Sequence, residues 1–284
     1  MLKNYYSITK PGIVSGNLIT AAAGFLLASK TNINFLLLLE MLIGTALIIS
    51  SAGIFNNYID RDIDAKMERT KNRALVKKLV PFQYALVLAA VLLILGTIVL
   101  WVFTNIPTVL TGLIGFFSYI FLYTVSKKYS VYSTIIGTLP GATPPVAGYL
   151  AVTNNFDLGA LMLFFILVFW QLPHFYAIGI YRLKDYRKAK IPILPVTKGV
   201  YVTKIAMILS ILLFTLFCAL LSVFGFTGLT FRVASIILGV AWLILAFGGF
   251  KTNNETRWAK KMFKFSLIVT MAIYLLISLN SLLP

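Results

Sequence analysis

The chain has 284 residues, of which 60% are hydrophobic and only 12% are charged. A soluble domain of this length has too little interior to bury so much apolar surface, so the composition excludes an ordinary soluble fold and predicts a membrane protein. The formal net charge of +17 would indicate nucleic-acid binding in a soluble protein. Here the basic residues follow the pattern of membrane topology instead, and we expect no nucleic-acid partner.

Apolar stretches long enough to cross a bilayer occur along the whole chain. A transmembrane helix needs about 20 apolar residues, and such stretches cover residues 11–29, 41–59, 79–126, 129–156, 158–181, 205–231, 233–250 and 265–284. The stretch 79–126 is long enough for two crossings, because Asn105 and Pro107 mark a turn within it. We therefore predict an all-α fold, a bundle of about nine transmembrane helices that forms a single domain over residues 1–284.

The basic residues gather in alternate connections between the expected spans. Of the 25 Lys and Arg residues, all but Lys30 and Arg232 fall on one side of the membrane when the spans are threaded in order. Basic residues are retained on the cytoplasmic side, so we expect the N-terminus inside and the C-terminus outside. The first span is followed by polar residues rather than by a small-residue cleavage site, which indicates a retained helix and not a signal peptide.

Four of the eight carboxylates follow the second span, in the loop over residues 60–80. Asn56, Asp60 and Asp64 recur every four residues, so they share one face if the helix continues. Asp60 with Asp64, and Asp64 with Glu68, are like-charge pairs that each cost about 0.2–0.5 kcal/mol on a helix. A solvated helix end would avoid such pairs, whereas Mg²⁺ prefers a few hard oxygen ligands together with substrate phosphate oxygens. The spacing therefore predicts a site for Mg²⁺ and a diphosphate, with Arg69, Lys71 and Arg73 beside it to clamp the phosphates.

The second large loop, over residues 182–199, follows the sixth span and lies on the same side of the membrane. Four spans separate the two loops, which indicates a weak parallel internal repeat. The overlay sets Asn56, Asp60 and Asp64 against Tyr181, Asp185 and Ala189. If the repeat is real, both loops face one shared cavity.

His174 is the only histidine of the chain and lies within the sixth span. A lone histidine is usually a satisfied structural group, but an ionisable residue inside a membrane helix is a functional hypothesis by default. Tyr181 is best interpreted as an anchor at the membrane interface, where aromatic residues are enriched.

The pattern Asn56-x-x-x-Asp60-x-x-x-Asp64 resembles the first signature of the UbiA-type membrane-embedded aromatic prenyltransferases, and residues 55–73 resemble their haem-modifying branch. Residues 170–175 and 181–196 are similar to the same branch, as are residues 9–12, 141–148 and 258–266. The likeness thus runs nearly from end to end. The superfamily commonly has a second carboxylate four residues after the first in its second signature, whereas here Asp185 is followed by Ala189. The haem branch shows this shortened form.

The resemblance implies transfer of a farnesyl group from farnesyl diphosphate to a vinyl group of haem B, with addition of water. It implies Mg²⁺ as cofactor, bound by Asn56, Asp60, Asp64 and Asp185. Its candidates for binding the diphosphate are Arg69, Lys71, Arg73, Lys127 and Lys184. In the same substrate-binding set, His174 would contact the iron of haem B and Tyr181 would orient a ligand. The resemblance also implies the bacterial cytoplasmic (inner) membrane, with membrane lipid around the protein and with haem A synthase or terminal oxidase assembly factors as candidate partners.

Three other functions remain open at this point. A prenyltransferase of the same type could act on another aromatic acceptor, such as a hydroxybenzoate or a chlorophyllide. A non-catalytic haem chaperone for oxidase assembly would bind haem without needing Asp60. A transporter or channel would also have many spans, but it would be expected to carry charges near the middle of the membrane, where this chain has almost none.

Overall fold

The computed structural model describes residues 2–280, and every regular element in that range is helical. The long helices are α2 (Pro11–Ser29), α3 (Phe35–Ile59), α5 (Phe82–Phe103), α6 (Ile106–Phe117), α8 (Ser133–Thr153), α9 (Leu158–Tyr181), α12 (Gly199–Val223), α13 (Leu229–Phe247) and α14 (Glu255–Ser278). The short ones are α1 (Leu2–Ile8), α4 (Arg61–Asp64), a π-helical turn η1 (Ser118–Tyr123), α7 (Thr124–Ser126), α10 (Leu183–Lys188), α11 (Leu194–Thr197) and a 3₁₀ turn η2 (Gly248–Lys251). The predicted all-α class is confirmed.

Within residues 2–280, nine helical segments are long and apolar enough to span a bilayer, as predicted. The fourth of them is composite, because α6, η1 and α7 run on as one segment over Ile106–Ser126. The expected turn inside residues 79–126 is present. There Asn105 caps α6, and its side-chain oxygen accepts a hydrogen bond of 3.0 Å from the backbone nitrogen of Thr108.

The structure differs from the expected spans at several of their ends, because charged residues near a helix end do not stop the helix. α3 begins at Phe35 rather than at residue 41 and carries Glu40 within it. α14 begins at Glu255 rather than at residue 265, so its first turns are basic. The turn expected near residue 232 lies earlier, between α12 and α13, where Gly225 adopts a φ of 79°. Residues 281–284 of the last expected span lie outside the described residues.

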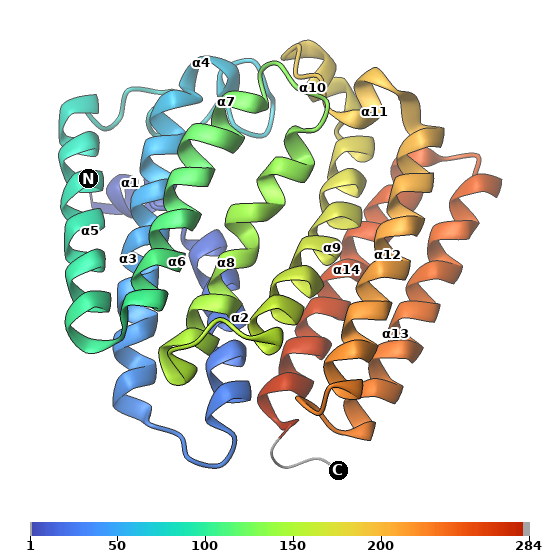
Figure 1. Ribbon diagram of the computed structural model, residues 1–284. Coiled ribbons are helices and arrows are strands. Elements are labelled where there is room, and N and C mark those ends of the chain that lie inside the picture. The colour runs from blue at the N-terminus through green and yellow to red at the C-terminus, as the bar shows by residue number, and fades with distance from the viewer. Residues whose placement is uncertain (1, 281–284) are drawn as a thin grey trace.

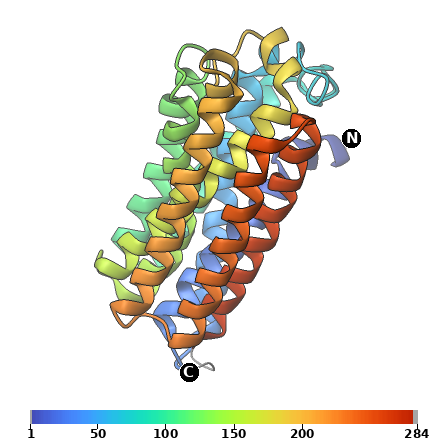
Figure 2. The ribbon, with the colours of Figure 1, turned by 90° about the vertical axis from the view of Figure 1, so that its right-hand side faces the viewer.

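A ring of helices surrounds the centre of the bundle. Neighbours pack in the order α2, α3, α6, α8, α9 and α14, and α14 closes the ring against α2. α5 packs outside α3, while α12 packs outside α9 and α13 outside α12, so α5 and α13 form the two edges of the view in Figure 1. Figure 2, turned by 90°, shows the long helices from the side of α13 and α14. Helices from both halves of the chain contribute to the ring. The single domain over residues 1–284 remains a prediction.

α2 and α8 approach each other closely in the half of the bundle away from α4. A Cβ atom on Gly24 would collide with the backbone carbonyl of Pro145, and one on Gly148 would collide with the carbonyl of Ala21. Small residues allow such backbone contact between membrane helices, which is a main source of their packing energy. The contact brings the backbones of α2 and α8 together in the centre of the ring at that end.

Candidate active site

A cavity of about 620 Å³ lies inside the ring of helices, which is within the usual size range of small-molecule sites. Its walls come from α2, α3, α6, η1, α8, α9 and α14, with further residues from the two large loops. The charged side chains that line it belong to the end near α4 and α7, which we call the charged end of the cavity. They are Lys10, Asp60, Asp64, Arg69, Arg73 and Lys127.

Asp60 and Asp64 lie at the charged end and are almost fully buried, with 1% and 5% of their surfaces exposed. α3 ends at Ile59, and α4 follows directly after Asp60. Backbone hydrogen bonds of 2.9 Å from Asp60 to Asn56 and of 2.8 Å from Asp64 to Asp60 carry the helical spacing across this junction. All three side chains therefore line the same cavity, as the spacing predicts.

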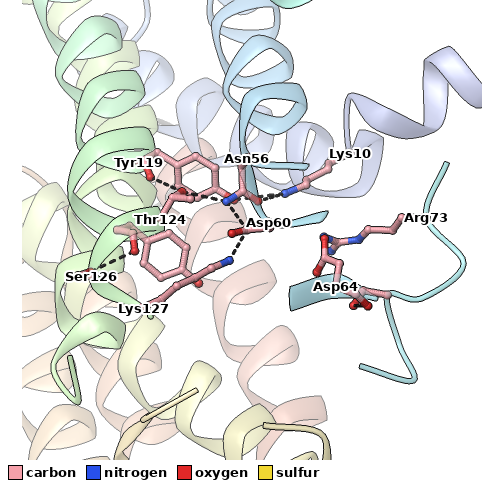
Figure 3. Close-up of polar contacts among 11 residues, drawn as sticks. Lys10, Asn56, Asp60, Asp64, Arg73, Tyr119, Thr124, Ser126 and Lys127 are labelled. Carbon is pink, nitrogen blue, oxygen red and sulfur yellow. Dashed lines mark hydrogen bonds and ion pairs between the residues drawn. The ribbon is translucent and has the colours of Figure 1, made fainter. Parts of the chain in front are cut away.

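Each of the two carboxylates forms an ion pair with a cation from another part of the chain. Lys127, just after α7, contacts Asp60, and Arg73, in the loop after α4, contacts Asp64 (Figure 3). The hydroxyl of Thr70 donates a 2.9 Å hydrogen bond to the backbone carbonyl of Asp64 and folds this loop back onto α4. These cations offset the repulsion between the two neighbouring carboxylates.

Asn56 lies between the ion pairs and holds Asp60 in place. Its Nδ2 donates to Asp60 Oδ2 at 2.7 Å and to Thr124 Oγ1 at 2.9 Å, while its Oδ1 accepts from Lys10 Nζ (Figure 3). The hydroxyl of Thr124 in turn donates to the backbone carbonyl of Tyr119 at 2.8 Å. The amide of Asn56 is thus fully used, and its oxygen is occupied by a lysine in this arrangement.

Lys10 lines the charged end, although it was not among the site residues predicted from the sequence. Its Nζ contacts Asn56 Oδ1 and lies 3.5 Å from the hydroxyl of Tyr119. Burial, followed by the nearby charges of Arg73 and Lys127, lowers the pKa of Lys10 to about 7. The residues around Lys10 do not indicate a partner on α3. The sequence signal for its role is that it belongs to segment 9–12, which resembles the prenyltransferases.

The junction between α1 and α2 brings Lys10 to this position. Lys10 itself adopts a left-handed backbone conformation, with a φ of 58°. The junction rests on α3 at Gly53, where an added Cβ would come within 3.0 Å of the carbonyl of Thr9. Asn57 fixes the same segment, because its Nδ2 donates to the carbonyl of Ile8 at 2.8 Å.

The π-helical turn η1 presents two tyrosines beside the charged end. The rings of Tyr119 and Tyr123 stack with their centroids 5.5 Å apart, and both line the cavity. Lys127 Nζ lies 5.8 Å from the centroid of Tyr123. Turns of this kind are frequent at functional sites, because the extra residue redirects the side chains that follow. Tyr119 was not predicted as a site residue, and the sequence carries no local signal for the π-helical turn.

The charged end fits a divalent cation. Asp60 Oδ1 is buried and accepts no hydrogen bond from the described residues, which is unusual for a carboxylate oxygen. Among residues 2–280, no three His, Cys, Asp or Glu side chains form a cluster that could hold a metal ion alone. Mg²⁺ is typically bound through one or two carboxylates plus substrate phosphates and water. Asp60 and Asp64 provide that kind of incomplete donor set.

The other predicted phosphate-binding residues lie in different surroundings. Arg69 lines the cavity. Lys71 is not among the lining residues and instead pairs with Glu68 at 2.5 Å, where both side chains are exposed. That hydrogen bond lowers the pKa of Glu68. Lys184 on α10 is also not among the lining residues, so the structure brings neither Lys71 nor Lys184 into the cavity.

The second loop faces the cavity through its aromatic and apolar residues rather than through its carboxylate. Tyr181 and Tyr186 line the cavity, but Asp185 does not. Asp185 Oδ2 is buried, has no hydrogen-bond donor among the described residues and lies 3.7 Å from Arg182 Nη1. Burial raises the pKa of Tyr186 to about 12, which keeps its phenol protonated at neutral pH.

His174 lines the cavity from α9 and is held from behind by α14. Its Nδ1 lies 2.8 Å from Ser266 Oγ, and that hydroxyl donates to the carbonyl of Phe263 at 2.6 Å. The hydroxyl hydrogen is therefore used, which assigns the ring proton to Nδ1 and leaves the lone pair of Nε2 free. Trp170 stacks on the imidazole with centroids 4.8 Å apart, and Tyr181 packs edge-on against Phe263 at 5.8 Å.

Residues 17–268 match the family model described as the UbiA prenyltransferase family. The chain is 47% identical to the Protoheme IX farnesyltransferase of Protochlamydia amoebophila, over 98% of each chain. It is 46% identical to the Protoheme IX farnesyltransferase of Cronobacter sakazakii, over 100% of this chain and 97% of that relative.

Solved structures match the fold at low sequence identity. A structure of digeranylgeranylglyceryl phosphate synthase superposes with a TM-score of 0.79 at 19% identity, covering 99% of this chain and 98% of that one. A UbiA homologue from Archaeoglobus fulgidus, solved bound to GPP and Mg²⁺, superposes with a TM-score of 0.74 at 15% identity, covering 97% and 99%. These matches confirm the predicted arrangement of membrane helices.

Proposed function

The chain belongs to the UbiA prenyltransferase family, and we propose that it is a haem-farnesylating member, a protohaem IX farnesyltransferase or haem O synthase. In the proposed reaction the bond between C1 and oxygen of farnesyl diphosphate breaks, and C1 bonds to the outer carbon of a vinyl group of haem B. The oxygen of a water molecule bonds to the inner vinyl carbon, and one proton of that water is released. The products are haem O and diphosphate.

The observation that carries the proposal is a buried set of two carboxylates and several cations at one end of an otherwise largely apolar cavity. A prenyl diphosphate has the matching distribution, with charge at one end and a long apolar tail. The near full-length identity to relatives named Protoheme IX farnesyltransferase supports haem B as the acceptor.

At the charged end, Asp60 and Asp64 hold Mg²⁺ in our proposal, with Asn56 and Asp185 as further oxygen ligands. Bound Mg²⁺ supplies positive charge that stabilises the leaving diphosphate. Lys127 and Arg73, which neutralise the aspartates in this structure, bind phosphate oxygens when the diphosphate is present. Lys10, like Lys127 and Arg73, would bind the diphosphate when it is present. Its contact with Asn56 would then be broken, and Asn56 Oδ1 would be available as a ligand for Mg²⁺.

The aromatic wall beside the charged end protects the reactive carbon. When the C1–O bond breaks, the allylic cation must meet the vinyl group before it meets water. Phe116, Tyr119 and Tyr123 line the cavity there and present π faces that stabilise positive charge. Because a vinyl carbon is a weak nucleophile, holding it against C1 contributes much of the rate.

His174 binds the iron of haem B through Nε2 in this proposal, with Tyr181 beside it to orient the substrate. The support is the tautomer, because Ser266 holds the proton on Nδ1 and leaves Nε2 as an axial ligand. Replacement of His174 by Ala should remove the absorption bands of histidine-ligated haem and weaken haem binding. The assignment is direct, since the chain has no other histidine. Unchanged spectrum and affinity would rule the contact out.

The protein is a multi-pass membrane protein. We place the charged end of the cavity on the cytoplasmic side of a bacterial inner membrane, with the N-terminus inside and the C-terminus outside, because that end carries most of the basic residues. Farnesyl diphosphate then enters from the cytoplasm and haem B from the membrane. Haem A synthase or an oxidase assembly factor would receive the product.

The experiment that tests this function is incubation of membranes containing the protein with farnesyl diphosphate, haem B and Mg²⁺, followed by mass analysis of the haem. We expect haem O, and none when EDTA replaces Mg²⁺. Farnesylation of a hydroxybenzoate or chlorophyllide in place of haem would instead identify another acceptor. Haem binding that is unchanged in Asp60→Ala, without turnover in the unmodified protein, would indicate a haem chaperone.

A further inference from the structure

Gln171 is a buried amide on α9, one turn from His174 and on the side that lines the cavity. Only 4% of its surface is exposed. Its Nε2 donates to the backbone carbonyls of Thr138 and Leu167, each at 3.1 Å. Both amide hydrogens are thus used on carbonyl acceptors, which fixes the orientation of the amide. Its Oε1 accepts no hydrogen bond from the described residues.

The wall of α8 is hollowed to accommodate that oxygen. A Cβ atom on Gly141 would collide with Gln171 Oε1, so only glycine leaves the oxygen its space. Gly141 also lines the cavity. Its backbone carbonyl lacks the usual helical donor, because the residue four positions later is Pro145, which has no N–H. The neighbouring carbonyl of Pro140, which faces Pro144, is served by the hydroxyl of Thr143 at 2.9 Å.

Two oxygen acceptors without a donor among the described residues therefore belong to adjoining parts of the cavity wall, Oε1 of Gln171 against the backbone of Gly141 and the carbonyl of Gly141 itself. Their ligand must supply hydrogens. A metal ion is a poor fit, because hard cations need about six oxygen ligands. A water molecule fits, since buried waters bridge polar groups that have no other partner. A water that donates both hydrogens to these acceptors directs its oxygen lone pairs into the cavity.

We infer that Gln171, with the carbonyl of Gly141, positions the water molecule that adds to the haem vinyl group. The inference rests on the proposed haem farnesylation. After C1 of the farnesyl group bonds to the outer vinyl carbon, the inner carbon carries the positive charge. The lone pair of the held water bonds to that carbon, and the released proton leaves with the diphosphate, which is the base that the reaction itself produces. Gln171 is a positioning residue here, because its amide is not basic enough to take the proton.

Without a positioned water, the same cation has a second fate. It loses a proton from the adjacent CH₂ group and gives a farnesylated haem that is lighter than haem O by one water molecule. The ratio of the two products therefore reports on the water alone, whereas their sum reports on farnesyl transfer. This separation makes the inference testable independently of the overall rate.

The test is Gln171→Met in membranes supplied with farnesyl diphosphate, haem B and Mg²⁺, with both products quantified by mass. Methionine keeps the side-chain length and removes the acceptor, while the helical backbone bonds of α8 and α9 remain. We expect the ratio of haem O to the dehydrated product to fall about tenfold or more, because loss of positioning slows one branch only. Gly141→Ala should shift the ratio in the same direction, since its methyl group displaces Oε1.

Ser210→Ala is the matched control, because Ser210 is a buried polar residue outside the cavity, and its product ratio should stay unchanged. Farnesylated haem that keeps the normal ratio in both test variants would overturn the inference. So would complete loss of farnesylated haem in a folded Gln171→Met protein, because the water acts after the carbon bond forms. If Gln171→Met does not fold, Gly141→Ala decides. If the unmodified protein makes no farnesylated haem of either kind, the proposed function itself has failed.

Discussion

The two loops at the charged end carry carboxylates in contrasting surroundings. In the first loop, Asp60 and Asp64 are buried, line the cavity and pair with cations from elsewhere in the chain. In the second loop, Asp185 does not line the cavity and is 3.7 Å from Arg182, three residues earlier on the chain. A carboxylate held by long-range contacts has a fixed position, whereas one held only by its own short helix can move. The first loop therefore provides the fixed half of the site.

The position that corresponds to Asp64 in the second loop shows why the loops are unequal. Ala189 is buried in a small apolar cluster with Met67, Ile191 and Ile193, which joins the two loops. Met67 comes from the first loop, so this cluster fixes the loops against each other. A carboxylate at position 189 would lose its hydration in that apolar contact. The second loop thus serves mainly to pack against the first.

Asp60→Asn should have the largest effect. The change removes the negative charge of a carboxylate whose own Oδ1 is buried without a donor, and it leaves Lys127 without its charged partner. We therefore expect farnesyl transfer to fall by about 100-fold or more. The measurement is haem O formation in membranes at saturating Mg²⁺. Asp62→Asn is the matched control, because Asp62 is in the same loop with its side chain 83% exposed, and it should retain activity. Equal losses in both variants would contradict a specific role for Asp60.

Asp185→Asn should have a smaller effect, of about tenfold, because Asp185 is proposed as a metal ligand but does not line the cavity. We expect part of the lost activity to return at higher Mg²⁺ concentration, since a weaker ligand set raises the concentration needed for binding. A Mg²⁺ titration of both aspartate variants measures this. If Asp185→Asn is as inactive as Asp60→Asn, the two loops contribute equally to the site.

Ala189→Asp tests whether the missing carboxylate could be restored. We expect no gain in activity and a loss of stability of about 1–3 kcal/mol, because a polar group enters an apolar contact. Thermal unfolding in detergent measures the stability. Ala189→Val is the apolar control and should be tolerated better. Increased turnover or tighter Mg²⁺ binding in Ala189→Asp would mean that the second loop can act as a full metal site.

Lys71→Ala and Lys184→Ala should have the smallest effects. Both residues were predicted from sequence to bind the diphosphate, but neither lines the cavity, and Lys71 forms an exposed pair with Glu68. Exposed pairs contribute little, so we expect activity within about twofold of the unmodified protein. The apparent KM for farnesyl diphosphate is the measurement. Arg69→Ala provides the contrast, because Arg69 lines the charged end and its loss should raise that KM.

The sequence was sufficient for the features that depend on local spacing. Hydrophobic length predicts the spans, and the four-residue spacing of Asn56, Asp60 and Asp64 predicts that they share one wall. Helix ends were less predictable, because α3 and α14 extend through charged residues at their ends. The spacing also indicated that Asp60 and Asp64 repel each other. In the structure, Lys127 and Arg73 of the same chain offset that repulsion.

What the sequence by itself determined is the membrane bundle, the first acidic wall and the likeness to a prenyltransferase family. Only the tertiary structure decided which charged residues meet. Lys10 contacts Asn56 across 46 positions, and Lys127 contacts Asp60 across 67. Lys184 and Asp185 lie in the sequence between Tyr181 and Tyr186, which line the cavity, yet they do not line it themselves. The reason is physical: spacing along one helix sets which side chains share a face, but helix packing sets which faces meet.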